Sequence, residues 1–313
     1  MSKRIISKLH NGLGNQMFIY ASSYGLSKKY KRKLFLDNES NFFKFKYIKK
    51  SFINNKYSLD CFNLSCDFAN KKDKFLGIFN YFKLKILKFL DSFREDNYRL
   101  FINEYKDLNK ISHYQENILS NLKQKKIFLN GHFETEKYFV NFRNDIKKEF
   151  SFKKENLFKR NKLYLKIKKS NSLAICIRQH RYSEKLSKVT YLDKSESQKF
   201  TFEQINYINK ALKMLRKKVK KYKIFVWSND YRDINKLIKF KNINLIKTNN
   251  VVLDLFLMSN CKYFIVIPST FNWWGAWLSD RNNKIVYRPH ESNFSKYKTN
   301  NVNFWPNKWI SVK

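Results

Sequence analysis

Gly12 and Gly14 lie two positions apart near the start of a chain that has six glycines in 313 residues. They follow an apolar run, Ile5 to Leu9, and precede a segment beginning at Asn15 that has helical spacing. Glycine lets a ligand approach the main chain closely, and the start of a helix offers backbone N–H groups without intrahelical partners. The arrangement is typical of a site where a ligand contacts the backbone.

A second candidate site lies in the other half of the chain. Arg178 ends a predicted buried strand, where a charge is costly unless it meets a counter-charge, and a guanidinium suits a phosphate. Pro268 ends a later strand, and Ser269 or Thr270 can cap the next helix, with hydroxyl and amide groups that suit a phosphate. A salt bridge to a structural carboxylate is the alternative for Arg178. Together, these residues indicate a phosphate site.

The first glycine turn falls short of a dinucleotide-binding fingerprint. The pattern G-x-G-x-x-G requires a third glycine where Met17 stands, although Asp37 ends the second predicted strand at roughly the right separation for a ribose contact. The missing glycine and the second anion site count against NAD. The chain also has no D-x-D pattern, so we expect no carboxylate-held metal; Arg178 and backbone amides would neutralise a leaving phosphate instead.

The elements that position these residues can be predicted from the hydrophobic pattern. In the first half, strand 5–9, helix 15–30 and strand 33–37 predict a βαβ unit with a parallel sheet. Residues 40–130 have a less regular and mostly helical pattern. A strand over 126–129 then leads into the loop that contains Glu134.

The second half alternates strands and helices more cleanly, after a Lys-rich connecting helix expected over 153–170. The predicted strands are 173–177, 223–227, 244–246, 263–267 and 284–287. The predicted helices include 252–258, 271–278, whose three tryptophans are expected to pack it onto the sheet, and one with a face of Phe202, Ile205, Ile208, Leu212 and Leu215. This rhythm indicates a doubly wound α/β domain, in which ligands bind at the carboxyl ends of the strands. Residues at those ends are Arg178, Asn229, Asp230, Ser269 and Thr270.

We therefore expect two α/β domains, 1–150 and 151–313. For a glycosyltransferase, the first would be the acceptor-side domain and the second would bind the nucleotide sugar. Two such halves, a phosphate site in the second and no metal motif indicate a metal-independent glycosyltransferase. The expected fold is GT-B-like, with two Rossmann-like domains facing each other across a cleft.

The composition limits the classes of partner. A net charge of +40 favours nucleotides, nucleic acid or acidic lipid, unless it reflects only the composition bias of an AT-rich genome. No nucleic-acid motif is present, so we expect at most salt-sensitive, sequence-blind affinity for nucleic acid. Four cysteines and five histidines form no zinc pattern. No signal peptide or membrane span is evident, so a cytoplasmic protein is expected.

One segment, 75–90, has two interpretations. Apolar residues recur there at helical spacing with lysines between them. The apolar residues are Phe75, Phe79, Phe82, Ile86 and Phe89, and the lysines are Lys83, Lys85 and Lys88. Such a basic amphipathic helix could lie on an anionic membrane. We favour the alternative, a core-facing helix with a solvated lysine face.

Five segments in order resemble the bacterial α-1,2-fucosyltransferases of glycosyltransferase family 11. They are GLGNQMFIYA at 12–21, with Asn11 in place of a preceding glycine; YSLDCFN at 57–63; GHFETEKYF at 131–139; FVWSND at 225–230; and the block 254–278, with Pro268 in place of an asparagine. The family motif H-x-R-R-G-D reads Cys176-Ile177-Arg178-Gln179-His180-Arg181 here. That departure bears on acceptor specificity, linkage and activity.

The resemblance implies inverting transfer of L-fucose from GDP-β-L-fucose to a hydroxyl, O2 of galactose, of a cell-surface glycan precursor. Arg178 would stabilise the leaving phosphate, with Ser269, Thr270 and Phe271 holding its oxygens. Asp254 would lie near the nucleotide. The remaining donor-site candidates are Gly12, Gly14, Asn15 and Asp230.

Glu134 is the best candidate for the general base by its chemistry, followed by His132 and Asp230. A structural hydrogen-bonding role for Glu134 stays open. So do another linkage or donor, an inactive GDP- or sugar-binding homologue, and a non-specific nucleic-acid-binding protein. The basic surface could hold the enzyme at the inner face of an anionic membrane.

Overall fold

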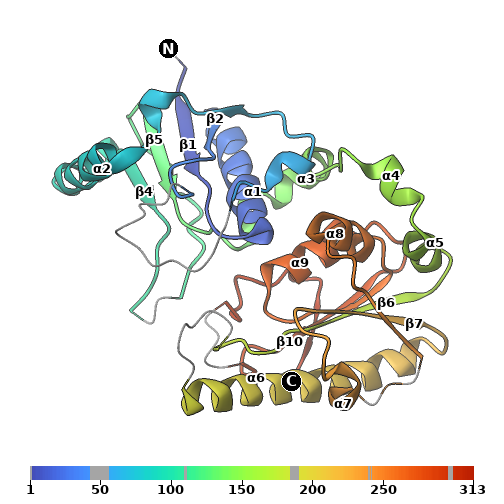
Figure 1. Ribbon diagram of the computed structural model, residues 1–313. Helices are drawn as coiled ribbons and strands as arrows, with labels where there is room; N and C mark the ends of the chain where they lie inside the picture. Colours follow the sequence, from blue (N-terminus) through green and yellow to red (C-terminus); the bar gives the residue numbers. More distant parts are fainter. Residues whose placement is uncertain are drawn as a thin grey trace. The chain divides into compact units, whose positions relative to one another are not determined.

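The structure is a computed structural model that describes residues 2–42, 56–108, 111–183, 190–238, 240, 242–294 and 299–313. The chain forms two compact units, Met1–Lys153 and Lys154–Lys313, which we call unit 1 and unit 2 (Figure 1). Within the described residues, no helix has the length and apolar character needed to cross a membrane.

Unit 1 is built on a parallel sheet of five strands in the order β3-β2-β1-β5-β4. Its strands are β1 (Arg4–Lys8), β2 (Lys33–Asp37), β3 (Asp67–Phe68), β4 (Phe101–Asn103) and β5 (Lys126–Asn130). The predicted βαβ unit is confirmed, because β1 pairs in parallel with β2 and helix α1 (Leu13–Lys29) connects them. The other helices are α2 (Gly77–Ser92) and α3 (Arg143–Glu149), with 3₁₀ turns at Leu59–Cys61, Lys71–Asp73, Asp96–Tyr98, Glu136–Tyr138 and Val140–Phe142.

Helix α1 is buried almost throughout, and its backbone passes very close to the segment at Tyr138 and Phe139. A Cβ atom on Gly25 would lie 2.0 Å from the backbone oxygen of Tyr138 and 2.9 Å from Cα of Phe139. Only a residue without a side chain allows this approach. The contact fixes the helix against the segment that follows Glu134.

Unit 2 has a six-stranded parallel sheet in the order β11-β10-β9-β6-β7-β8. Its strands are β6 (Ser172–Ile177), β7 (Lys223–Ser228), β8 (Ile243–Leu245), β9 (Tyr263–Ile265), β10 (Ile285–Pro289) and β11 (Ile310–Val312). Its helices are α4 (Glu155–Lys159), α5 (Lys162–Lys168), α6 (Tyr191–Lys218), α7 (Ile234–Leu237), α8 (Val251–Ser259) and α9 (Thr270–Leu278). Helix α6 covers one face of the sheet, and α8 and α9 lie on the other (Figure 1). Helices on both faces explain why β6 is buried at every position.

The tryptophans of α9 pack the interior of unit 2, as the sequence predicted. Trp273, Trp274 and Trp277 are fully buried. The rings of Trp273 and Trp277 stack with 5.9 Å between centroids, and Trp274 meets Trp273 edge-on at 4.8 Å.

Three sequence predictions are wrong in detail. Residues 40–130 contain strands β3 and β4 as well as helix, because these short strands extend the sheet outward from β2 and β5. The single helix expected over 153–170 is two short ones, since the Asn161 side chain accepts from the Leu163 amide and caps a new start. On α6, Phe202 is 67% exposed, and the buried face instead includes Phe200, Gln204 and Tyr207.

The favoured interpretation of segment 75–90 is also wrong. The helix forms as α2, but only Leu84 and Asp91 are buried on it. Phe79 is 87% exposed and Phe89 is 64% exposed. The apolar face stays exposed because α2 packs on unit 1 by its opposite face. There Asp91 Oδ1 and Oδ2 accept from the amides of Leu100 (2.7 Å) and Phe101 (2.9 Å) at the start of β4.

We predict that Gly25→Ala destabilises the protein, because the new methyl group meets rigid backbone rather than a movable side chain. The expected loss is about 1–3 kcal/mol, the usual range for overpacking. Thermal unfolding followed by circular dichroism measures it. Gly12→Ala is the matched control, since a Cβ there meets nothing within 4 Å and the backbone φ is −80°. Equal melting temperatures for the two variants would contradict the prediction.

Candidate functional site

A pocket of about 280 Å³ opens at the carboxyl ends of the central strands of unit 2. Its lining comes from the ends of β6 and β7, from α8 and from the first turn of α9. The lining residues are Cys176, Ile177, Arg178, Trp227, Ser228, Asn229, Tyr231, Val251, Asp254, Ile267, Ser269, Phe271 and Asn272. The structure thus brings together five of the predicted residues, which are Arg178, Asn229, Asp254, Ser269 and Phe271. Asp230 and Thr270 are not among the lining residues.

Arg178 is held in place by a buried glutamine on α6. Gln204 Oε1 accepts from the backbone N–H of Arg178 at 2.9 Å, and its Nε2 donates to the backbone oxygen of Arg178 at 2.7 Å. Gln204 is fully buried. One amide side chain therefore satisfies both backbone groups of the residue that follows β6, which would otherwise be unpaired at the end of the strand.

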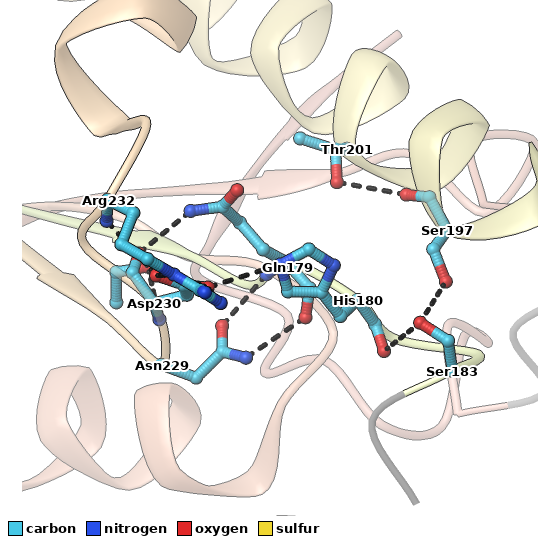
Figure 2. A network of polar contacts seen from close by, with 9 residues as sticks. Gln179, His180, Ser183, Ser197, Thr201, Asn229, Asp230 and Arg232 are labelled. Atoms are coloured by element: carbon cyan, nitrogen blue, oxygen red, sulfur yellow. Dashed lines mark hydrogen bonds and ion pairs between the residues drawn. The ribbon is translucent and has the colours of Figure 1, made fainter. Parts of the chain in front are cut away.

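The same helix secures the segment that follows. Ser197 Oγ accepts from the Tyr182 amide at 3.1 Å and lies 3.3 Å from the Ser183 hydroxyl. Thr201 Oγ1 donates back to the Ser197 carbonyl at 2.9 Å. Figure 2 shows this part of α6 beside the chain that leaves β6.

A second amide joins the ends of β6 and β7. Asn229 Oδ1 accepts from the Gln179 amide at 2.8 Å, and its Nδ2 donates to the Gln179 carbonyl at 3.0 Å (Figure 2). The Gln179 side chain donates to the Asp230 carbonyl at 2.8 Å. The Asp230 carboxylate pairs with Arg232 and with His180. Hydrogen bonds from Arg232 hold the pKa of Asp230 well below its usual range.

The altered motif at 176–181 is therefore part of an ordered network. His180 has a φ of 55°, in the left-handed region that favours glycine, and it occupies the glycine position of the motif H-x-R-R-G-D. Gln179 occupies the position of the second arginine and is buried with its amide satisfied. The backbone at the motif's glycine position is thus left-handed in this chain, although a histidine stands there.

Asp254 enters the pocket region from the first turn of α8. Asn250 caps this helix by accepting from the amides of Val252 and Leu253, and Thr248 Oγ1 donates to Asp254 Oδ1 at 2.8 Å. Burial raises the pKa of Asp254, against the hydrogen bond from Thr248, which favours the charged carboxylate.

Helix α9 begins beside this pocket. Ser269 takes the N-cap position that the sequence predicted, but its side chain makes no capping hydrogen bond, and its carbonyl accepts from the Trp273 amide at 3.0 Å. The first turn of a helix favours anions through its amides and its dipole. The first turn of α9 and Arg178 thus give one pocket two kinds of group that bind phosphate.

Unit 1 has a second polar cluster, at the carboxyl ends of β1 and β5. Asn15 Nδ2 donates to Glu134 Oε1 at 2.8 Å, and Asn11 Nδ2 donates to His132 Nε2 at 2.8 Å. Glu104 accepts from the amides of His132 (3.0 Å) and Phe133 (2.8 Å). A Cβ on Gly131 would lie 2.4 Å from Cβ of Glu104, so glycine is needed for this contact.

In the turn before α1, the residue with the unusual backbone conformation is Asn11 and neither of the two glycines. Asn11 has the left-handed backbone, with φ 62°, whereas Gly12 is extended at the N-cap and Gly14 lies buried inside α1. Asparagine tolerates this conformation, which accounts for Asn11 in place of a preceding glycine. Open space beside Gly12 leaves room for a ligand to approach.

The three candidate bases, Glu134, His132 and Asp230, have very different proton affinities, and the lowered pKa of Asp230 is described above. Burial raises the pKa of Glu134 to about 7, and the charge of Glu104 adds to the rise, while Lys106 and the Asn15 hydrogen bond oppose it. Burial, His10 and Lys106 lower the pKa of His132 to about 3. A general base is most effective when its pKa is near the working pH. Glu134 meets this requirement, and His132 is a poor proton acceptor.

Gln204 and Glu104 are the positioning residues that sequence reasoning missed. Gln204 could have been identified from the sequence because it is a polar residue at a position on the buried face of α6. No comparable signal marks Glu104, because its partners are backbone amides 28 and 29 residues away. Within the described residues, no group of three or more His, Cys, Asp or Glu side chains could hold a metal ion.

Comparisons with known proteins show the family to which the chain belongs. The chain matches Glycosyl transferase family 11 over residues 5–313. It is 26% identical to an α-1,2-colitosyltransferase of Escherichia coli, over 99% of both chains. It is also 26% identical to the O-antigen biosynthesis glycosyltransferase WbnK of Escherichia coli, over 91% of this chain and 93% of that protein.

Solved structures show the same fold. NodZ α-1,6-fucosyltransferase soaked with GDP-fucose aligns with a TM-score of 0.50 at 11% identity, over 91% of this chain and 97% of that one. Arabidopsis thaliana FUT1 in complex with GDP aligns with a TM-score of 0.50 at 9% identity, over 89% and 69%. The protein is a glycosyltransferase with a GT-B-like fold, as the sequence predicted. More narrowly, the chain belongs to glycosyltransferase family 11.

We predict that Glu104→Gln lowers the pKa of Glu134, because it removes the like charge that adds to the effect of burial. A ¹³C NMR titration of labelled glutamate side chains measures the shift. Glu134→Gln assigns the signal by deleting it. An unchanged titration near pH 7 in Glu104→Gln would mean that burial alone sets the pKa.

Proposed function

We propose that this enzyme transfers L-fucose from GDP-β-L-fucose to a sugar hydroxyl, with inversion and without a metal ion. The observation that carries the proposal is the unit 2 pocket, where Arg178 and the first turn of α9 meet Asp254 at the carboxyl ends of parallel strands. Membership of family 11 and the fold shared with a fucosyltransferase support it. A pocket of about 280 Å³ is at the small end for ligand sites, so it would hold part of the donor.

In the proposed reaction, unit 2 holds the donor. The Arg178 guanidinium and the amides at the start of α9 would bind the diphosphate and stabilise the negative charge that grows on it. As the bond between C1 of fucose and the β-phosphate oxygen breaks, its electron pair stays on that oxygen. Asp254 would accept hydrogen bonds from the nucleotide base. Gln204 would not contact the donor and would support donor binding by holding the backbone of Arg178 in place.

Glu134 of unit 1 would act on the acceptor. The hydroxyl oxygen forms the new bond to C1 while its proton passes to the Glu134 carboxylate, so the β-linked donor gives an α-linked product. A pKa of about 7 allows Glu134 to be ionised before the reaction and still accept a proton during it. Asn15 would orient the carboxylate through its 2.8 Å hydrogen bond.

The proposed acceptor is galactose, at O2, in a cell-surface glycan precursor assembled in the cytoplasm at the inner face of the membrane. The two curated relatives, named for α-1,2-colitose transfer and for O-antigen biosynthesis, support this class of product. The colitosyltransferase also favours one alternative donor, GDP-colitose, because colitose is L-fucose without its 3-hydroxyl group. Turnover with the two donors in parallel separates these activities.

We predict that the protein binds GDP in the presence of EDTA and that Arg178→Ala abolishes this binding, measured by calorimetry. Turnover of Arg178→Ala should fall ~10²–10³-fold, the scale for losing one electrostatic donor. Arg216→Ala is the matched control, since Arg216 is an exposed arginine of unit 2 outside the pocket. Near-normal turnover of Arg178→Ala at saturating donor would refute the mechanism. Binding that requires added metal would refute the metal-independent part.

We predict that kcat/KM falls as the pH drops below about 7, because Glu134 is then protonated and cannot accept the hydroxyl proton. Glu134→Gln should lose ~10²–10⁴ in kcat and lose this pH dependence, while GDP affinity stays unchanged. Glu116→Gln, at an exposed position of unit 1, serves as the control. Full activity of Glu134→Gln would leave this carboxyl a structural role only.

A further inference from the structure

Helix α2 carries an apolar stripe that no part of the described structure covers. Its side chains recur at spacings of three and four residues, which align them along one face of a helix. They are Phe79, Phe82, Ile86, Phe89 and Phe93, with Ile78 and Leu90 beside them, and all are exposed. Singly exposed apolar residues are ordinary, but a continuous stripe of this kind marks an interaction surface.

The helix is attached to unit 1 by its other face. Leu84 and Asp91 are buried there, and the Asp91 carboxylate binds the amides at the start of β4. The Lys88 ammonium lies 5.6 Å from the centre of the Phe101 ring. This attachment fixes the rotation of α2 about its own axis and leaves the stripe pointing outward.

Basic side chains border the stripe on both sides. At about 100° per residue, Lys85 falls on one border, and Lys83 falls on the other. Both lysines are exposed. The carboxylates nearby are Asp91, on the attached face, and Glu95 and Asp96, which follow the end of the helix. The exposed charged side chains within α2 itself, Gly77–Ser92, are therefore all positive.

We propose that the α2 stripe is a docking surface for a bilayer rich in anionic lipids. The phenylalanine and isoleucine side chains would enter the boundary between headgroups and acyl chains, with the helix lying in the plane of the interface. Lys83 and Lys85 would extend along the apolar surface and place their ammonium groups among the lipid phosphates. The net charge of +40 would add attraction to the same membrane.

The charge pattern disfavours a second copy of the chain as the occupant. Two α2 helices packed stripe to stripe would bring lysines against lysines at the borders, and like charges there oppose association. An anionic lipid surface complements both the apolar stripe and its borders. The stripe belongs to unit 1 and shares no residue with the lining of the unit 2 pocket, so loss of docking should leave donor binding unchanged.

The test is sedimentation of the full chain with vesicles. Wild type should bind vesicles of phosphatidylcholine with phosphatidylglycerol at least tenfold more tightly than vesicles of phosphatidylcholine alone. Phe79→Ser/Phe89→Ser keeps every positive charge and should weaken binding to the anionic vesicles at least tenfold. Phe202→Ser is the matched control, because it removes an exposed phenylalanine from unit 2. Lys83→Gln/Lys85→Gln should weaken binding to anionic vesicles and not to neutral ones.

Circular dichroism and GDP binding verify that each variant is folded. Three outcomes would overturn the proposal: no binding of wild type to anionic vesicles, equal binding by wild type and Phe79→Ser/Phe89→Ser, or an equal loss in Phe202→Ser. A wild-type dimer in light scattering that dissociates in Phe79→Ser/Phe89→Ser would assign the stripe to a second copy instead.

Discussion

The candidate donor site depends on how the backbone is satisfied where β6 ends. A parallel strand that stops inside a domain leaves amide and carbonyl groups without ladder partners, and an unpaired buried group costs roughly 1–3 kcal/mol. Gln204 supplies a donor and an acceptor to Arg178, and Asn229 does the same for Gln179. Neutral amides can do both at once, which no carboxylate or lysine can. The arginine is thereby placed at the pocket without a second charge beside its backbone.

In unit 1, unpaired backbone amides are satisfied by a charged side chain, Glu104, and its charge affects the pKa of a neighbouring carboxyl. The two side-chain oxygens of Glu104 accept from the amides of His132 and Phe133, and the charge of Glu104 acts on Glu134. The interaction that orders the loop therefore also raises the pKa of the neighbouring carboxyl. Lys106 and Asn15 favour the charged form and oppose the rise, and the resulting pKa of Glu134 is about 7. Glu104 thus both orders the loop and adds to the rise in the pKa of Glu134 that burial causes.

The sequence predicted the parts of the fold that depend on local pattern. Strands β1, β2, β6 and β7 contain short apolar runs, and α1 has apolar residues at helical spacing. All five formed within one or two residues of their expected bounds. Strands β3 and β4 are too short to show a period. Arg178 and Ser269 could be found because they follow buried strands. Glu104 could not, because a distant backbone amide leaves no mark on the sequence. Periodicity also showed that α2 is amphipathic without showing which face would pack.

The altered motif at 176–181 changes the formal charge at the end of β6. H-x-R-R-G-D carries two arginines and one aspartate, a formal charge of +1, whereas this chain has Arg178 and Arg181 with no acid, a formal charge of +2 with His180 neutral. His180 has a left-handed backbone at the motif's glycine position, and the Gln179 side chain donates to the Asp230 carbonyl. Asp230, from the end of β7, is the carboxylate that His180 contacts at this edge, and Arg232 pairs with it as well. A more positive strand end strengthens the attraction for a diphosphate. The acidic position of the motif is lost, so any carboxylate needed beside Arg178 must come from a neighbouring element.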